Sequence, residues 1–78
     1  MDQQTVNYLT PLVGELVDVS WRNGHTVSGI LGINQMAYNV EPGCGGFGVH
    51  YIQGTETRFL LVFPGATLTC EGREYILR

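Results

Sequence analysis

The strongest constraint on the fold is a stretch with a period of two that begins soon after Gly14. Apolar residues alternate with polar ones at Val17, Val19 and Trp21. A period of two is typical of a strand with one buried face. The Asn23-Gly24 pair follows at once, and Asn-Gly is well suited to the left-handed dihedrals of a two-residue hairpin turn. The sequence therefore predicts a β-hairpin.

The return strand of this hairpin contains a glycine that points to a special geometry. Val27, Leu31 and Ile33 continue the alternation, and Gly29 occupies the same face. A glycine inside a strand has no side chain to pack, so it marks a sharp bend or a close approach of another backbone. Such corners are needed where a sheet bends into a barrel.

Further short strands follow, separated by glycine and proline turns. Eleven of the 78 residues are glycine and only 14% are charged, a composition that favours an all-β domain. The expected strands are residues 38–40, 49–53, 58–63 and 66–70. The run 58–63 is apolar on both faces, which suggests burial on both sides. Residues 73–78 are left open, as an extra strand or as an arm for a neighbouring copy.

The start of the chain is the one place that favours a helix. Asp2 can cap it, Val6 and Leu9 share one face, and Pro11 ends it, because a proline disfavours helical geometry in the residue before it. Residues 1–78 are thus expected to form a single domain, which is small for a chain that folds alone.

Composition limits the function classes. The net charge is −3, which argues against a general affinity for phosphate backbones, so any nucleic-acid site must be local. The sequence shows no secretory signal and no apolar run of about 20 residues that could cross a bilayer. We therefore expect a cytoplasmic protein without membrane attachment.

The chemistry-bearing residues favour no enzyme, metal or cofactor. Cys44, Cys70, His25 and His50 lack zinc-site spacing, and the serines and threonines have no catalytic partner pattern. We expect Cys70 to be buried and Cys44 to be exposed. The glycine cluster at residues 43–48 reads as a flexible loop. Of the two aromatic residues that could stack on a base, Trp21 and Phe47, Phe47 is the better candidate for an exposed one, but a structural role is favoured for both.

Taken as an ordered set, the motifs resemble one family. A short helix precedes Gly14-x-x-Val17-x-Val19-x-Trp21, Asn23-Gly24 and Gly29-x-Leu31, and Asn39-Val40 comes ten residues after Gly29. This order resembles the first motif of the Sm-like proteins, and Phe63-Pro64-Gly65-x-x-Leu68 stands where their second motif stands. The resemblance implies a small, strongly bent, five- to six-stranded Sm-like (SH3-like) barrel with a short N-terminal helix.

The resemblance also implies a binding site for single-stranded RNA at the pore of a ring. Carried over residue by residue, the RNA-binding positions are Gln35, Asn39 and Gly65. The amide of Asn39 can donate to and accept from a base edge. The family's base-stacking position is Ala37 here and its cationic position is Pro64, so weak or selective binding is expected.

Homo-oligomeric rings are the second implication. In Sm-like rings the fourth strand of one subunit pairs with the fifth strand of its neighbour. Independently, an apolar strand on an open edge favours a partner. The expected interface residues are Phe59, Leu60, Leu61, Val62, Phe63, Ala66, Leu68 and Cys70.

Two functions remain open from the sequence. One is a ring-forming RNA-binding protein of the Sm-like type. The other is an Sm- or SH3-like barrel that serves as an oligomeric assembly or protein-interaction module without RNA binding.

Overall fold

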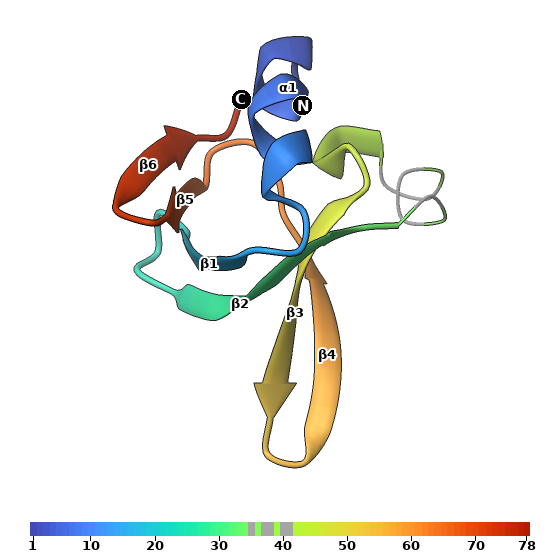
Figure 1. The fold of residues 1–78 in the computed structure, drawn as a ribbon, viewed down its shortest axis with the longest axis vertical. Helices are drawn as coiled ribbons and strands as arrows, with labels where there is room; N and C mark the ends of the chain where they lie inside the picture. Colours follow the sequence, from blue (N-terminus) through green and yellow to red (C-terminus); the bar gives the residue numbers. More distant parts are fainter. Residues whose placement is uncertain (35, 37–38, 40–41) are drawn as a thin grey trace.

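The protein is mostly β, with a short helix at its N-terminus (Figure 1). The computed structural model describes residues 1–34, 36, 39 and 42–78. The helical segments are α1 (Gln3–Leu9) and the 3-10 turns η1 (Thr10–Leu12) and η2 (Pro42–Cys44). The strands are β1 (Leu16–Ser20), β2 (Thr26–Ile33), β3 (Phe47–Gln53), β4 (Glu56–Leu61), β5 (Thr67–Cys70) and β6 (Arg73–Ile76).

All six strands belong to one antiparallel sheet. Their order is β4-β3-β2-β1-β5-β6, so the sheet is open and ends at β4 and at β6. Strand β2 is shared between two neighbours: residues 26–30 pair with β1, and residues 30–33 pair with β3. The prediction of a β-rich domain with a short N-terminal helix is therefore confirmed, and residues 73–76 form an extra strand.

Helix α1 is capped as the sequence predicts. The N–H of Thr5 donates to Asp2 Oδ1 over 2.8 Å, the contact expected of an N-cap aspartate. Leu9 is fully buried. The N–H of Asp2 donates to the carbonyl of Arg78, and the N–H of Arg78 donates to Thr5 Oγ1. These bonds hold the two ends of the described chain together.

The first hairpin turn is one residue longer than the Asn-Gly pair suggests. The N–H of Gly24 donates to Trp21 O, and the N–H of Trp21 donates to His25 O. Gly24 has a φ of +85°. A tight turn followed by one left-handed glycine is the three-residue hairpin loop. The prediction of a two-residue turn is therefore wrong, because Gly24 is the last residue of a three-residue loop.

Gly29 lies where β2 changes partners, and it allows a close backbone approach. A Cβ at this position would stand 2.1 Å from His50 O and 2.7 Å from Val49 Cγ1. No side chain can occupy that space. The prediction that Gly29 marks a close approach is confirmed.

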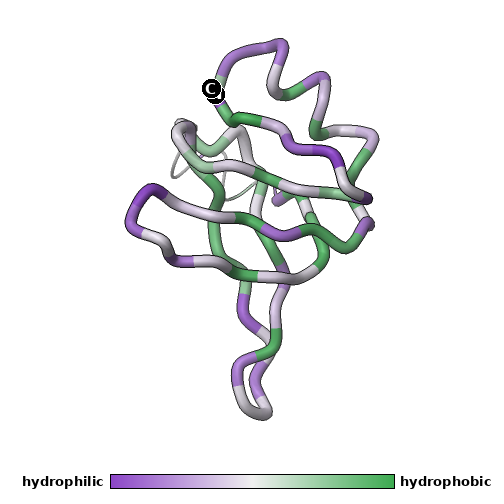
Figure 2. Tube along the Cα trace, turned by 90° about the vertical axis from the view of Figure 1, so that its left-hand side faces the viewer, coloured by the Kyte–Doolittle hydropathy of each residue, from purple (hydrophilic) through white to green (hydrophobic). Residues whose placement is uncertain are grey.

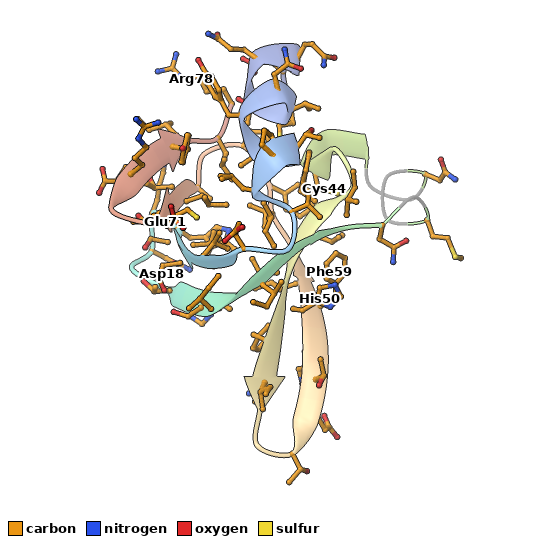
Figure 3. All side chains as sticks on the ribbon, viewed as in Figure 1. Asp18, Cys44, His50, Phe59, Glu71 and Arg78 are labelled. Carbon is orange, nitrogen blue, oxygen red and sulfur yellow. The ribbon has the colours of Figure 1, made fainter. Side chains whose placement is uncertain are left out.

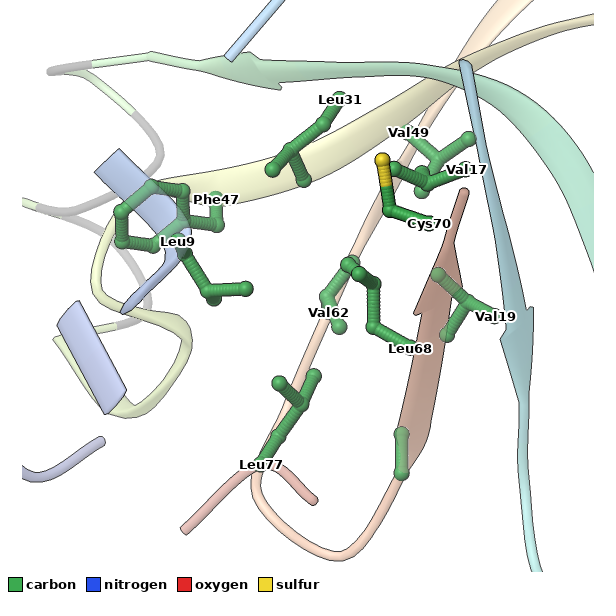
Figure 4. Packing of buried hydrophobic residues seen from close by; sticks show 11 residues of the cluster. Leu9, Val17, Val19, Leu31, Phe47, Val49, Val62, Leu68, Cys70 and Leu77 are labelled. Carbon is green, nitrogen blue, oxygen red and sulfur yellow. The ribbon is translucent and has the colours of Figure 1, made fainter. Parts of the chain in front are cut away.

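The core lies on one face of the sheet, under α1 (Figure 4). Strands β1, β3 and β5 each contribute alternate residues to it, and β2 and α1 contribute one leucine each. Its members are Leu9, Val17, Val19, Leu31, Phe47, Val49, Val62, Ala66, Leu68, Cys70 and Leu77. The predicted alternation of β1 and β2 is thus confirmed at Val17, Val19 and Leu31.

The segment between β2 and β3 differs most from the sequence prediction. Asn39 has helical backbone and an exposed side chain, so the strand expected at residues 38–40 is wrong at this residue, while Tyr38 and Val40 lie outside the described residues. The third strand begins instead at Phe47. Gly45 and Gly46 both have positive φ, which turns the chain inward, so Phe47 and Cys44 are fully buried. The expectation that Cys44 is exposed is wrong, and Phe47 has the structural role that was favoured for it.

Strands β3 and β4 project from the body as a narrow arm, seen from two sides in Figures 1 and 2. Beyond His50, β3 pairs with β4 but β2 has already turned away. Ile52 on this arm is 76% exposed. The sheet face opposite the core, called the outer face here, includes a row of cross-strand neighbours: Leu16, Ile30, His50 and Phe59.

Candidate functional site

The structure describes two of the three residues that the resemblance placed at one RNA site, Asn39 and Gly65. Asn39 lies in the connection between β2 and β3, and its side chain is exposed. Gly65 lies in the turn between β4 and β5, with a φ of +101°. Gln35 and Ala37 lie outside the described residues.

Gly65 borders a pocket beside the first hairpin turn. The pocket has a volume of about 420 Å³, and its described lining is Trp21, Arg22, Asn23, Pro64 and Gly65. The half-buried Trp21 ring lies 5.8 Å from the His25 ring. The pocket therefore combines an aromatic ring, a guanidinium and an amide, although Asn39 is not among the described residues that line it.

The positive charges are spread over the fold. Arg22 belongs to the first hairpin turn, Arg58 to β4, Arg73 to β6, and Arg78 follows β6. Arg58 Nη2 lies 2.9 Å from Glu56 Oε2, and both side chains are more than half exposed. Of the four, Arg22 alone is in the described lining of the pocket.

The predicted interface residues divide into two groups. Four of them contribute to the core of their own chain and are buried there: Val62, Ala66, Leu68 and Cys70. Phe59, Leu60 and Leu61 on β4 are half-buried, and Phe63 is partly exposed. The accessible part of the predicted interface is therefore β4 and the residue that follows it closely, Phe63.

Strand β5 has neighbours on both sides. It pairs with β1 through Asp18 and Thr69, and with β6 through Thr69 and Glu74. A neighbouring chain therefore cannot add to β5 without displacing β6. Of the two alternatives left open by the sequence for residues 73–78, the structure therefore shows the extra strand, and that strand covers the edge of β5.

A groove runs between α1 and β6. Its volume is about 490 Å³ and its lining includes Gln4, Tyr8, Glu74, Tyr75, Ile76 and Arg78. The Tyr8 and Tyr75 rings lie 6.1 Å apart. Ile76 is 58% exposed. The edge strand β6 thus borders a concave surface that carries both aromatic and charged groups.

Among the residues that the structure describes, two titratable groups have shifted pKa values. The backbone N–H of Thr5 lowers the pKa of Asp2, helped by the charge of Arg78. Burial raises the pKa of the Cys70 thiol, helped by the nearby negative charges of Glu71 and Glu15. Both shifts belong to structural roles, as a helix cap and as a core residue. In Figure 3, Cys44 and His50 lie apart from each other and from Glu71 and Asp18.

Among residues 1–34, 36, 39 and 42–78, no three His, Cys, Asp or Glu side chains come together as metal ligands. None of the helices described there is long and apolar enough to span a membrane.

Comparison with known proteins finds no matching family model, no matching curated protein and no matching solved structure. The Sm-like resemblance therefore rests on the sequence motifs. The unpaired sheet edges, the pocket at Gly65 and the groove beside β6 are the features from which a function can be argued.

Proposed function

We propose that this protein is a homo-oligomeric assembly module of the Sm-like type, in which copies join through the edge strands of their sheets. The observation that carries the proposal is the edge strand β4. It ends the sheet, and its half-buried residues Phe59, Leu60 and Leu61 occupy both faces. An apolar unpaired edge is a template for another strand.

The strand arrangement supports the same proposal. A short helix precedes β1 and β2, and β5 follows later in the chain, so the segments with the Gly14–Leu31 and Phe63–Leu68 motifs belong to one antiparallel sheet. The shared strand β2 bends the sheet near Gly29, as a strongly bent barrel requires. Assembly would also add buried surface to a domain of only 78 residues, whose own core is small.

Sedimentation analysis tests the proposal directly. The measured mass should exceed that of one chain, and the melting temperature should rise with protein concentration, because association stabilises the folded state by mass action. A chain that sediments as a monomer over a roughly hundredfold concentration range, with a constant melting temperature, would exclude the proposal.

A second candidate function is local binding of single-stranded RNA. The observation that favours it is the pocket beside Gly65, whose described lining includes both Trp21 and Arg22. A ring that stacks on a base and a cation near the backbone are the two recurring parts of single-strand binding sites. The net charge of −3 and the spread of the other arginines weigh against wider contact.

Titration with labelled U-rich and A-rich oligonucleotides at low salt tests this candidate. Trp21 is the only tryptophan of the chain, so its fluorescence reports binding at the pocket. Binding that is lost in Arg22→Gln but kept in Asn39→Ala would assign RNA to this pocket. The reverse pattern would assign it to the β2–β3 connection, and no binding by the wild type would exclude the RNA function.

A further inference from the structure

We infer that the joint between copies is formed by β4 of one chain and β6 of the next, in an antiparallel and head-to-tail manner. The inference rests on the proposed assembly function and names its contact surface. These two strands end the sheet at its opposite sides. The inferred joint differs from a pairing through β5, because β6 already occupies that side of β5.

The backbone of β6 directs two donors outward. The N–H of Leu77 donates to Ala66 O, so it points toward the β5 side. Successive N–H groups of an antiparallel strand point to opposite sides. The N–H groups of Ile76 and Glu74 therefore point away from β5, toward the free edge.

The same reasoning applies to β4. The N–H of Val62 donates to Phe47 O, which directs it toward β3. Alternation then directs the N–H groups of Leu61, Phe59 and Thr57 toward the free edge. Both edges thus offer outward donors at every second residue, as an antiparallel ladder needs.

Side-chain faces agree with this pairing. Phe59 lies on the outer face as the partner of His50. Glu74 lies there too, because it pairs with Thr69, which pairs with Asp18. On both edges, then, the residues with outward N–H groups carry outer-face side chains. Since directly opposed residues of a ladder share a face, the outer faces of two joined copies become continuous.

The charge and composition of the two edge strands favour a second copy of this chain as the binding partner. Strand β4 contains Glu56 and Arg58, and β6 contains Arg73 and Glu74. Each edge therefore carries one charge of each sign, and neither repels the other. Both strands also lack lysine and proline, the residues that commonly block edge pairing. The exposed Ile76 and the groove beside β6 would be covered by the added strand.

Two proline variants test the joint. Glu74→Pro removes an outward N–H of β6, and Thr57→Pro removes one of β4, while the bonds to β5 and β3 remain. Each variant alone should sediment as a monomer at concentrations where the wild type is assembled. Their matched controls, Glu74→Ala and Thr57→Ala, keep the N–H groups and should assemble within about threefold of the wild-type dissociation constant.

Mixing the two proline variants gives the decisive result. One retains a working β4 edge and the other a working β6 edge, so the mixture should form a one-to-one dimer and stop there, because a head-to-tail contact leaves each dimer one blocked edge of each kind. An assembled Glu74→Pro protein, or a mixture that stays monomeric beside an assembled wild type, would overturn the β4–β6 joint alone. A monomeric wild type would overturn the assembly function itself.

Cross-linking provides a readout that does not depend on proline. A bismaleimide should join Thr57→Cys chains to Ile76→Cys chains in a mixture, and should join neither variant to itself at a comparable rate. The wild type, whose cysteines Cys44 and Cys70 are buried, serves as the control for background. Equal cross-linking within each variant would contradict a head-to-tail contact.

Discussion

The ring of Phe59 lies beside the ring of His50, with centroids 4.5 Å apart and planes inclined by 33°, and it covers the backbone of Gly48. A Cβ on Gly48 would stand 2.5 Å from the Phe59 ring and 2.8 Å from Leu60 O. The two rings therefore pack on the outer face because this glycine leaves room (Figure 3).

Gly48→Ala should destabilise the protein by about 1–3 kcal/mol, because the added methyl group displaces a packed ring. Urea unfolding measures the change. In a Phe59→Leu background the same substitution should cost less, with a coupling of about 0.5–3 kcal/mol in the double-mutant cycle. Strictly additive effects would show that the ring and the glycine are not coupled.

Gly29→Ala should also destabilise the protein, by about 2–3 kcal/mol, since its Cβ would meet the backbone carbonyl of His50 and backbone cannot move as a side chain can. Gly43→Ala is the matched control, because its Cβ would make an ordinary contact of 3.8 Å with Phe63. Thermal melts at one protein concentration compare the two. Equal losses would contradict the close approach of β2 and β3.

Leu68→Ala should remove about 3 kcal/mol of stability, because Leu68 is fully buried in the core and its truncation leaves a cavity. For a domain this small, that is a large part of the total. Leu16→Ala is a control of the same chemistry, since Leu16 is 68% exposed on the outer face and should change stability by less than about 0.5 kcal/mol. A comparable loss at Leu16 would instead reveal that the outer face is covered in solution.

The parts of the fold that the sequence predicted are those set by local rules. The alternation of Val17 and Val19 reflects the pleat of one strand, and the cap at Asp2 needs only the first turn of α1. The close approach at Gly29 could be predicted because a glycine inside a strand has no side chain to pack and usually marks a bend or a close approach of another backbone.

The parts that the sequence missed depend on distant contacts. Phe47 stands between glycines, which suggests a solvated loop, yet it is buried by the core that α1 and the sheet form around it. Because β6 pairs with β5, the free edge on that side of the sheet is β6 and not β5. The sequence of one strand does not specify which strand it pairs with. The pocket that Gly65 lines together with Trp21 likewise joins segments that are distant in the sequence.

Cys70 should react slowly with thiol reagents in the folded protein. Burial removes it from solvent and raises its pKa, so little reactive thiolate forms near neutral pH. Iodoacetamide labelling followed by peptide mass spectrometry should give a rate at least tenfold below that of an unfolded control in urea. Labelling as fast as in urea would show that β5 opens readily.

Because the folded pKa of Cys70 is raised, this thiol contributes stability below the ordinary thiol pKa of about 8.5, and that contribution falls as the pH rises above it.

The helix cap should make stability depend on pH at the acid end. Hydrogen bonding from Thr5 lowers the pKa of Asp2 in the folded state. A carboxylate with a lowered folded pKa contributes stability that is fully present above the unfolded pKa of about 3.9 and is lost as the pH falls through the folded value.

Asp2→Asn keeps a capping oxygen without the charge, whereas Asp2→Ala removes both. The melting temperature of the wild type should therefore exceed that of Asp2→Asn at neutral pH, and the difference should close in acid. The deficit of Asp2→Ala relative to Asp2→Asn should persist at every pH. A wild-type advantage over Asp2→Asn that stays constant from neutral pH into acid would show that the charge on Asp2 does not act through the Thr5 N–H.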